Sequence, residues 1–282
     1  MATGRIWFIT GVSTGLGRTL AEAVLENGDY VAGTLRQAEQ MAAFTALNPE
    51  RAFAVQMDVT RPEQVEAAVK QVVDHFGRID VLVNNSGHGM IGAIEETSDA
   101  EARHLFDVNV FGVLTVLRAV LPHLRAQKRG WIVNLSSQGG MRSFAGSGIY
   151  CASKHALEAF SESLSLELSH LGIKVLIVEP GPFRTDFLGR SMVLTENVIA
   201  DYANTSGQRR TNLSSLDGKQ IGDPVRAASA IIKAVESPTP PLRLALGEPA
   251  LTGMREKVQG VLKDWADWEA ESLAADYPPD ER

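Results

Sequence analysis

A tyrosine and a lysine in this chain are spaced in a way that suits proton transfer to an oxygen atom. Tyr150 and Lys154 are four residues apart, so on a helix they project from one face, one turn apart. A tyrosine with a pKa near 10 is a poor acid or base at neutral pH. We expect the cation of Lys154 to lower the pKa of Tyr150 toward the working range. Taken alone, the pair also fits a packed aromatic ring beside a solvated charge.

A glycine-rich turn at residues 10–17, TGVSTGLG, indicates the binding of a phosphate. Glycine is needed where the backbone must approach a pyrophosphate without a Cβ, and the helix that follows offers unpaired N–H groups and a positive dipole. The spacing is not the common G-x-G-x-x-G form, because the first gap between glycines is wider. A tight turn in a generic α/β fold is the alternative interpretation.

The end of the second predicted strand, Gly33-Thr34-Leu35-Arg36, bears on the choice of cofactor. In dinucleotide-binding folds a carboxylate near this point holds the ribose hydroxyls, whereas an arginine accommodates a 2′-phosphate. Arg36 stands where the carboxylate would be, and Ser13 and Arg18 could add to the same pocket. The pattern favours NADP(H) over NAD(H), with a solvated surface arginine as the alternative.

The elements that must position these residues alternate between apolar strands and segments of helical period. The predicted strands are residues 5–10, 29–34, 51–55, 79–83, 131–135, 173–179 and 242–246. The predicted helices are residues 16–27, 37–47, 62–76, 100–127, 149–171 and 223–236, followed by a terminal helix that carries Trp265 and Trp268 and closes the domain. The alternation predicts an α/β fold: a doubly wound (Rossmann-type), mostly parallel sheet with helices on both faces.

A single domain over residues 1–282 is the simplest organisation, because no linker or repeat divides the chain. Within it, residues 186–222 have weak periodicity and are expected to form an irregular substrate loop or lid. Residues 249–282 are expected to form a C-terminal extension. Trp265 and Trp268 are expected to pack in the core or in an interface, with substrate contact as the alternative.

Composition narrows the class of protein. Charged residues make up 22% and the net charge is −7, which gives no reason to expect nucleic acid or an anionic membrane as a partner. No stretch approaches the roughly 20 apolar residues of a membrane span, and the N-terminus does not read as a signal peptide. One cysteine, Cys151, excludes an intrachain disulfide and is expected to be packed rather than reactive. We expect a cytoplasmic protein without a metal site.

Six short motifs follow one another along the chain. They are TGVSTGLG at 10–17, Asp58-Val59, NNSG at 84–87, Val108-Asn109-Val110, Ser137 with Tyr150 and Lys154, and PGPFRT at 180–185. Together they resemble the motifs of the short-chain dehydrogenase/reductase family, in its single-domain NADP(H)-preferring branch, over residues 5–187. Each motif alone is weak, but six in register are very specific. Ser86 departs from the pattern, since it stands where the family has alanine.

The resemblance implies a role for each matching residue. Asn109, Ser137, Tyr150 and Lys154 form the catalytic set, in which Ser137 binds the substrate oxygen and Asn109 holds a water that relays protons to Lys154. The substrate-pocket candidates are His88, Ser137, Gln138 and Tyr150, although His88 could equally be structural. The cofactor-binding residues are Gly11, Ser13, Thr14, Gly15, Leu16, Gly17, Arg36, Asp58, Val59, Asn85, Ser86, Gly87, Tyr150, Lys154, Pro180, Gly181 and Thr185.

The resemblance therefore implies an NADP(H)-dependent oxidoreductase that interconverts a ketone or aldehyde and an alcohol, with Tyr150 as general acid/base. An analogy within the family suggests bulky lipophilic carbonyls. Two alternatives stay open: an NADP(H)-binding sensor without turnover, and an epimerase or dehydratase on the same scaffold. The long helices at 100–127 and 149–171 would be the surfaces of a homo-oligomer, either a dimer or a tetramer.

Overall fold

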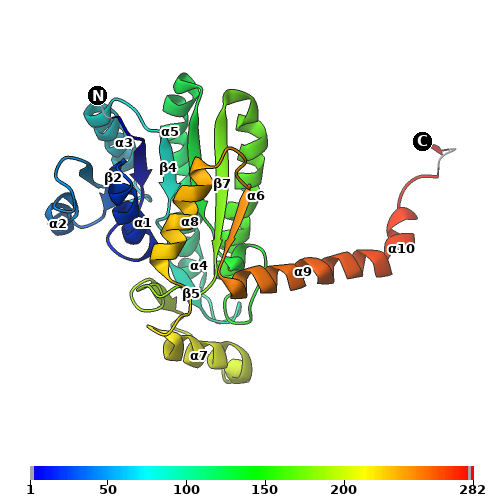
Figure 1. Ribbon diagram of the computed structural model, residues 1–282. Helices are drawn as coiled ribbons and strands as arrows, with labels where there is room; N and C mark the ends of the chain where they lie inside the picture. The colour runs from blue at the N-terminus through cyan, green and yellow to red at the C-terminus, as the bar shows by residue number, and fades with distance from the viewer. Residues whose placement is uncertain (1–2, 279–280) are drawn as a thin grey trace.

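A parallel sheet runs through the middle of the protein (Figure 1). The computed structural model describes residues 3–278 and 281–282, apart from the side chain of Ser214. Among these residues the sheet has seven strands in the order β3-β2-β1-β4-β6-β7-β9. They are β1 (Ile6–Ile9), β2 (Tyr30–Leu35), β3 (Ala52–Gln56), β4 (Val81–Asn84), β6 (Gly130–Leu135), β7 (Ile173–Pro180) and β9 (Arg243–Leu246). This order, which reverses at β1, confirms the doubly wound α/β fold.

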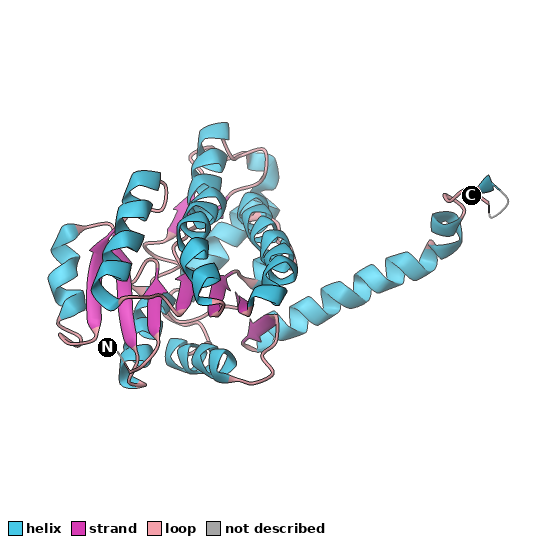
Figure 2. Ribbon diagram, turned by 90° about the horizontal axis from the view of Figure 1, so that it is seen from above, coloured by secondary structure: helices cyan, strands magenta, loops and turns pink. Residues whose placement is uncertain are grey.

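Helices cover both faces of the sheet (Figure 2), which explains why its strands are continuous apolar runs. One face packs against α1 (Gly15–Glu26), α2 (Met41–Thr45) and α8 (Pro224–Glu236). The other packs against α3 (Pro62–Phe76), α5 (Gly112–Gln127) and α6 (Gly148–Leu168). All four residues of β1 are fully buried between these layers.

The helix predicted over 100–127 is divided into three parts. α4 (Asp99–Phe106) is followed by a π-helical segment, Asp107–Phe111, and then by α5. A π-helical turn inserts an extra residue into the helix and often marks a functional site, and here it contains Asn109. The expectation that no stretch approaches a membrane span is wrong by this criterion: within the described residues, Asp99–Gln127 is a helical run long and apolar enough to cross a membrane by length and composition. Packing against the sheet explains that apolar character, because the run contributes core residues such as Val116 and Leu117.

The region predicted as an irregular loop, residues 186–222, contains regular structure. β8 (Met192–Leu194) pairs in parallel with β5 (Gly89–Ile91), and α7 (Gln208–Leu216) follows short helical turns at 200–207. The predicted helix at 37–47 is shorter, consisting of a 3₁₀ turn, Ala38–Gln40, and α2. Strands of three residues are too short to show a period of two, and the polar α7 shows almost no apolar stripe, so neither was visible in the sequence.

The C-terminal helix projects away from the body of the protein (Figures 1 and 2). α9 (Glu248–Asp267) buries only Ala250, Gly253 and Met254, all in its first two turns, and α10 (Glu269–Leu273) follows it. Trp265 and Trp268 are 66% and 65% exposed, so the expectation that this helix closes the domain is wrong. An apolar stripe shows that a helix face needs a partner, but it does not say that the partner is the same domain.

Candidate active site

A cavity of about 490 Å³ lies where the carboxyl ends of the strands meet α7 and the loops that follow the strands. In open α/β sheets this is where ligands bind. The predicted site residues that line it are Gly11, Ser13, Thr14, Gly15, Leu16, Arg36, Asp58, Val59, Asn85, Ser86, Gly87, His88, Ser137, Gln138, Tyr150, Lys154, Pro180, Gly181 and Thr185. Gly17 and Asn109 are predicted site residues that do not line the cavity.

The glycine turn has the shape that a pyrophosphate requires. Gly11 and Gly15 have φ of 71° and 65°, values that residues with a side chain rarely adopt. No side chain caps the start of α1 at Thr14, so its first N–H groups remain available to an anion. Gly17 has a different role: a Cβ there would lie 2.2 Å from Nδ2 of Asn85, so this glycine allows α1 to pack against the loop after β4. The glycine turn at residues 10–17 therefore fits the phosphate of a dinucleotide.

Arg36 lines the cavity at the end of β2 and is exposed. Near it lies Asp58, which accepts hydrogen bonds from the backbone N–H and the hydroxyl of Thr60 at 2.9 and 2.8 Å. Burial alone would raise the pKa of Asp58, but these bonds and the charge of Arg36 lower it. Arg18 does not line the cavity, contrary to expectation. It pairs with Glu22 at 2.6 Å and lies over the ring of Phe44.

Tyr150 and Lys154 lie one turn apart near the start of α6, beside the loop that follows β6. Nζ of Lys154 donates a hydrogen bond to the carbonyl oxygen of Leu135 at 2.8 Å, which ties α6 to the end of β6. Burial lowers the pKa of Lys154 to about 8, although the carboxylate of Glu158 raises it. A buried ammonium of this kind is held only where it has specific partners.

Ser137 lines the cavity together with Tyr150, and its hydroxyl accepts a hydrogen bond from the backbone N–H of Gly139 at 3.0 Å. Burial raises the pKa of Tyr150 to about 12, although the hydrogen bond from Ser137 lowers it. In the protein on its own the pKa of Tyr150 is therefore raised and not lowered toward the working range, because desolvation of the phenolate is the largest effect on it. Tyr150 is held as a protonated acid that faces the cavity.

Asn109 lies behind the cavity wall rather than in it. Its side chain is buried, and both of its polar groups bond the backbone of His88: Oδ1 accepts from the N–H at 3.0 Å and Nδ2 donates to the carbonyl at 2.9 Å. Nδ2 also donates to the hydroxyl of Ser153 at 3.2 Å. Asn109 thus fixes the loop after β4, and its role in holding a water stays a prediction.

His88 lines the cavity and lies 5.4 Å from the ring of His104. Burial lowers the pKa of His88 to about 4, and the charges of His104, Arg36 and Lys154 lower it further. His88 is consequently neutral at physiological pH and can offer a hydrogen bond without a charge.

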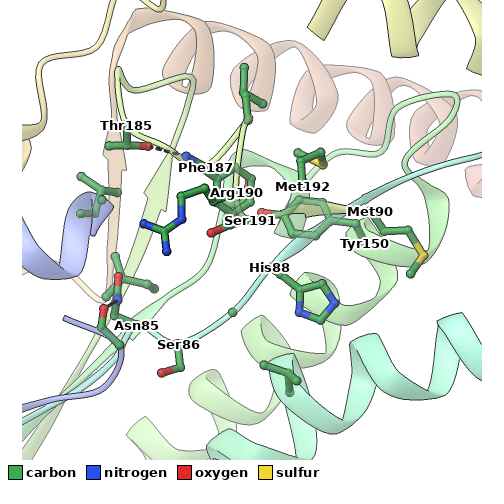
Figure 3. A pocket seen from close by; sticks show the side chains of 18 of the residues that line it. Asn85, Ser86, His88, Met90, Tyr150, Thr185, Phe187, Arg190, Ser191 and Met192 are labelled. Atoms are coloured by element: carbon green, nitrogen blue, oxygen red, sulfur yellow. Dashed lines mark hydrogen bonds between the residues drawn. The ribbon is translucent and has the colours of Figure 1, made fainter. Parts of the chain in front are cut away.

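One wall of the cavity lies partly in the predicted substrate loop at 186–222, but none of its apolar residues was named from the sequence. It is formed by apolar side chains from β5, the loop before α6, the 183–193 segment and α7 (Figure 3). They include Met90, Ile91, Phe144, Phe187, Leu188, Met192, Val193, Leu213 and Leu216. The Phe187 ring lies 6.2 Å from that of Tyr150. The weak periodicity of residues 186–222 pointed to a substrate loop there, but which of its side chains face the cavity depends on the pairing of β5 with β8.

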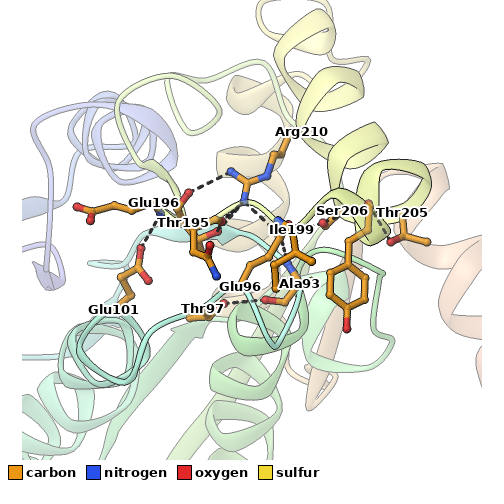
Figure 4. A network of polar contacts seen from close by, with 12 residues as sticks. Ala93, Glu96, Thr97, Glu101, Thr195, Glu196, Ile199, Thr205, Ser206 and Arg210 are labelled. Atoms are coloured by element: carbon orange, nitrogen blue, oxygen red, sulfur yellow. Dashed lines mark hydrogen bonds and ion pairs between the residues drawn. The ribbon is translucent and has the colours of Figure 1, made fainter.

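A buried carboxylate anchors the segment that carries β8 and α7 (Figure 4). Glu96 accepts hydrogen bonds from the backbone N–H groups of Ala93 and Ile199, from the hydroxyl of Ser206 and from Arg210, at 2.7 to 3.3 Å. Burial raises its pKa, but these bonds together lower the pKa to about 2. Arg210 also donates to the hydroxyl of Thr195 at 2.6 Å. The wall of the cavity is therefore held by charge-assisted bonds.

The sequence matches a family model, described as short chain dehydrogenase, over residues 5–192. The chain belongs to this family. Oxidoreductase BOA17 of Botryotinia fuckeliana is 38% identical over 272 residues, which cover 96% of this chain and 99% of that protein. A 3-ketodihydrosphingosine reductase of Bacteroides thetaiotaomicron is 36% identical over 86% of this chain and 88% of its own length.

Solved structures share the fold, among them one of a short-chain dehydrogenase. One from Streptomyces avermitilis is 42% identical, covers 97% of this chain and 100% of its own, and superposes with a TM-score of 0.90. ElxO with NADP bound is 27% identical over 89% of this chain and 100% of its own, with a TM-score of 0.74. Membership of the short chain dehydrogenase family makes this protein an oxidoreductase.

Proposed function

We propose that this short chain dehydrogenase is an NADP(H)-dependent oxidoreductase that interconverts a ketone or aldehyde and an alcohol. The observation that carries the proposal is the position of Tyr150: it lies one turn from Lys154 on α6, and it lines the same cavity as Ser137 and the glycine turn. A proton donor and a phosphate site in one cavity suit a reaction that moves a hydride and a proton together.

The residues of the chain fit a nicotinamide dinucleotide. The glycine turn, at Gly11–Leu16, would hold the pyrophosphate, and Arg36 would hold the 2′-phosphate. Asp58 and Val59 would contact the adenine, and Thr185 would contact the amide of the nicotinamide. When bound, NADPH supplies a hydride to the carbonyl carbon of the substrate. The preference for NADP(H) is supported by the exposed guanidinium of Arg36 at the cavity, which suits a 2′-phosphate. It is also supported by Asp58, because its carboxylate already accepts a hydrogen bond from the hydroxyl of Thr60.

The proton comes from Tyr150. With a pKa of about 12 its hydroxyl is protonated at neutral pH and can donate to the carbonyl oxygen as negative charge develops there. Ser137 donates a second hydrogen bond to that oxygen, which stabilises the developing alkoxide. The ammonium of Lys154 stabilises the tyrosinate that remains after the transfer. Alcohol oxidation follows the reverse path, with Tyr150 as the base.

We further propose that the protein acts in the cytoplasm, without a membrane or nucleic acid as partner, and as a homodimer or homotetramer. The net charge of −7 supports the first part. Exposed apolar side chains on the long helices support the second: Phe111 is 56% exposed and Leu166 is 75% exposed. Size-exclusion chromatography with light scattering measures the oligomeric state.

The test of the reaction follows loss of NADPH by near-ultraviolet absorbance with a panel of aliphatic, aromatic and steroid-sized carbonyls. We expect turnover with at least one class, and a loss of roughly 10² to 10⁴-fold in kcat for Tyr150→Phe with NADPH binding retained. Equal turnover by Tyr150→Phe would overturn the proposed mechanism. Tight NADPH binding with no consumption across the panel would favour a sensor, and product without NADPH loss would favour an epimerase or dehydratase.

A further inference from the structure

Arg209 brings an unpaired positive charge to the substrate side of the cavity. It extends from α7 and lines the cavity together with Phe144, Ser147 and Tyr150. Its guanidinium carbon lies 4.6 Å from the centre of the Phe144 ring. Its Nε is buried and has no hydrogen-bond partner among the described residues. A buried donor without a partner is costly, and native proteins usually satisfy such a group with protein, water or ligand.

No carboxylate of the described residues lies within ion-pair distance of Arg209. Another cation, Arg142, approaches the same ring, and its guanidinium carbon lies 4.7 Å from the centre of the Phe144 ring. Burial is the largest effect on Arg209 and lowers its pKa, whereas the Cys151 thiol raises it and the charge of Arg142 lowers it by less. Among the described residues that line the cavity, Asp58 is the single carboxylate, and it lies beside Arg36.

The neighbouring arginine shows what a structural arginine looks like in the same helix. Arg210 pairs with Glu96 at 3.3 Å and bonds Thr195, so its terminal nitrogens hold the wall of the cavity. Arg209 has no ion-pair or hydrogen-bond partner of this kind among the described residues, and it lines the cavity. The other guanidinium of this region, Arg190, lies on the side of the cavity where Thr185 and Asn85 lie (Figure 3). Arg209 is therefore the cation that a substrate would meet beyond Tyr150.

We propose that the substrate is an apolar ketone or aldehyde that carries a carboxylate, and that Arg209 is the counter-ion of this carboxylate. The inference rests on the proposed reduction and names its substrate class. The apolar wall of Phe144, Phe187, Met192 and Leu213 covers the body of the substrate while the carbonyl lies at Tyr150 and Ser137. Guanidinium and carboxylate form paired, charge-assisted hydrogen bonds, which are strong in a partly buried site.

The first test compares substrates that differ only in charge. Aryl keto acids with two, four and six methylene groups between the ketone and the carboxylate, beginning with 4-oxo-4-phenylbutanoate, are assayed beside their methyl esters. We expect kcat/KM for the best acid to exceed that of its ester by at least roughly tenfold, the size of one charged hydrogen bond. Arg209→Met should remove the preference for the acid and leave the ester unchanged within about twofold, while Arg209→Lys should keep part of it. Arg142→Met, which removes a guanidinium from the same ring but does not line the cavity, should retain the preference.

The second test measures binding without turnover. The probes are 4-phenylbutanoate and its methyl ester, which have no ketone, titrated into wild type and Arg209→Met by calorimetry. Tighter binding of the acid that depends on Arg209 supports the inference even when no ketone is reduced, an outcome that would overturn the proposed reaction alone. Equal affinity of acid and ester for wild type overturns the inference even when ketones are reduced. Circular dichroism of each variant confirms that it is folded.

Discussion

Asn109 bonds both backbone groups of His88, accepting from its N–H at 3.0 Å and donating to its carbonyl at 2.9 Å. The two residues come from a π-helical turn and from the loop after β4, which lie 21 positions apart in sequence. Gly87 makes this approach possible, because a Cβ there would lie 3.0 Å from Oδ1 of Asn109. The side chain of Asn109 thus replaces a backbone partner for a loop that borders both halves of the cavity.

Asn109→Ala should destabilise the protein and weaken its activity. Two backbone groups of His88 lose their partners, and a fully buried group costs about 1–3 kcal/mol when left unpaired; because these two are only half-buried, we expect a decrease of about 2–4 kcal/mol in the free energy of unfolding by urea. His88→Ala is the matched control, because it keeps the backbone that Asn109 bonds and should remain within about 1 kcal/mol of wild type. A stable Asn109→Ala protein with lost activity would instead assign Asn109 to the chemistry.

Arg36→Met should change the choice of cofactor. If Arg36 binds the 2′-phosphate, its loss removes charged hydrogen bonds, and kcat/KM for NADPH should fall roughly 10- to 100-fold while that for NADH stays within about threefold. Arg18→Met serves as the control, since Arg18 pairs with Glu22 and lies outside the cavity. An Arg36→Met enzyme that discriminates between the cofactors as wild type does would contradict the assignment.

The pH profile of reduction should report the charge of Lys154. Its pKa of about 8 means that the ammonium is lost as the pH rises through that value, so kcat should fall above about pH 8. Glu158 raises the pKa of Lys154, and Glu158→Gln should therefore shift the fall to lower pH. Glu162→Gln, which removes a half-exposed carboxylate one turn further along α6, should leave the profile in place. A profile that stays fixed in Glu158→Gln would exclude Lys154 as the titrating group.

Glu96 should stabilise the wall of the cavity in a pH-dependent way. Its folded pKa of about 2 lies below the ordinary value of 4.5, so its contribution is fully present above about pH 4.5 and is lost as the pH falls toward 2. Glu96→Gln should unfold at lower urea concentration than wild type at pH 7, by about 1–3 kcal/mol, with a difference that shrinks between pH 4.5 and 2. Glu95→Gln is the control, because Glu95 is exposed and bonds only the hydroxyl of Tyr202 among the described residues. A difference that is constant with pH would mean that packing, not charge, is responsible.

The sequence by itself determined the layered fold and the identity of the family. Strands such as Ile6–Ile9 are continuous apolar runs, and helices such as α3 have a clear apolar stripe and a proline in the first turn, so local pattern was sufficient. The glycine turn and the Tyr150–Lys154 spacing also depend on residues close in sequence. The motifs predicted that Gly11, Gly15, Tyr150 and Lys154 share one site, and in the structure these residues line one cavity.

Tertiary structure alone decided what depends on distant pairs. The apolar wall needs β5 and β8, which lie a hundred residues apart in sequence, and the anchoring of α7 needs Glu96 to meet Arg210. Burial reversed the expected pKa shift of Tyr150, because desolvation depends on every element packed around the hydroxyl rather than on the lysine four residues away. The helix that carries Trp265 projects from the domain, and Trp265 is exposed. An amphipathic pattern predicts that one helix face will be buried, but it does not predict which surface will bury it.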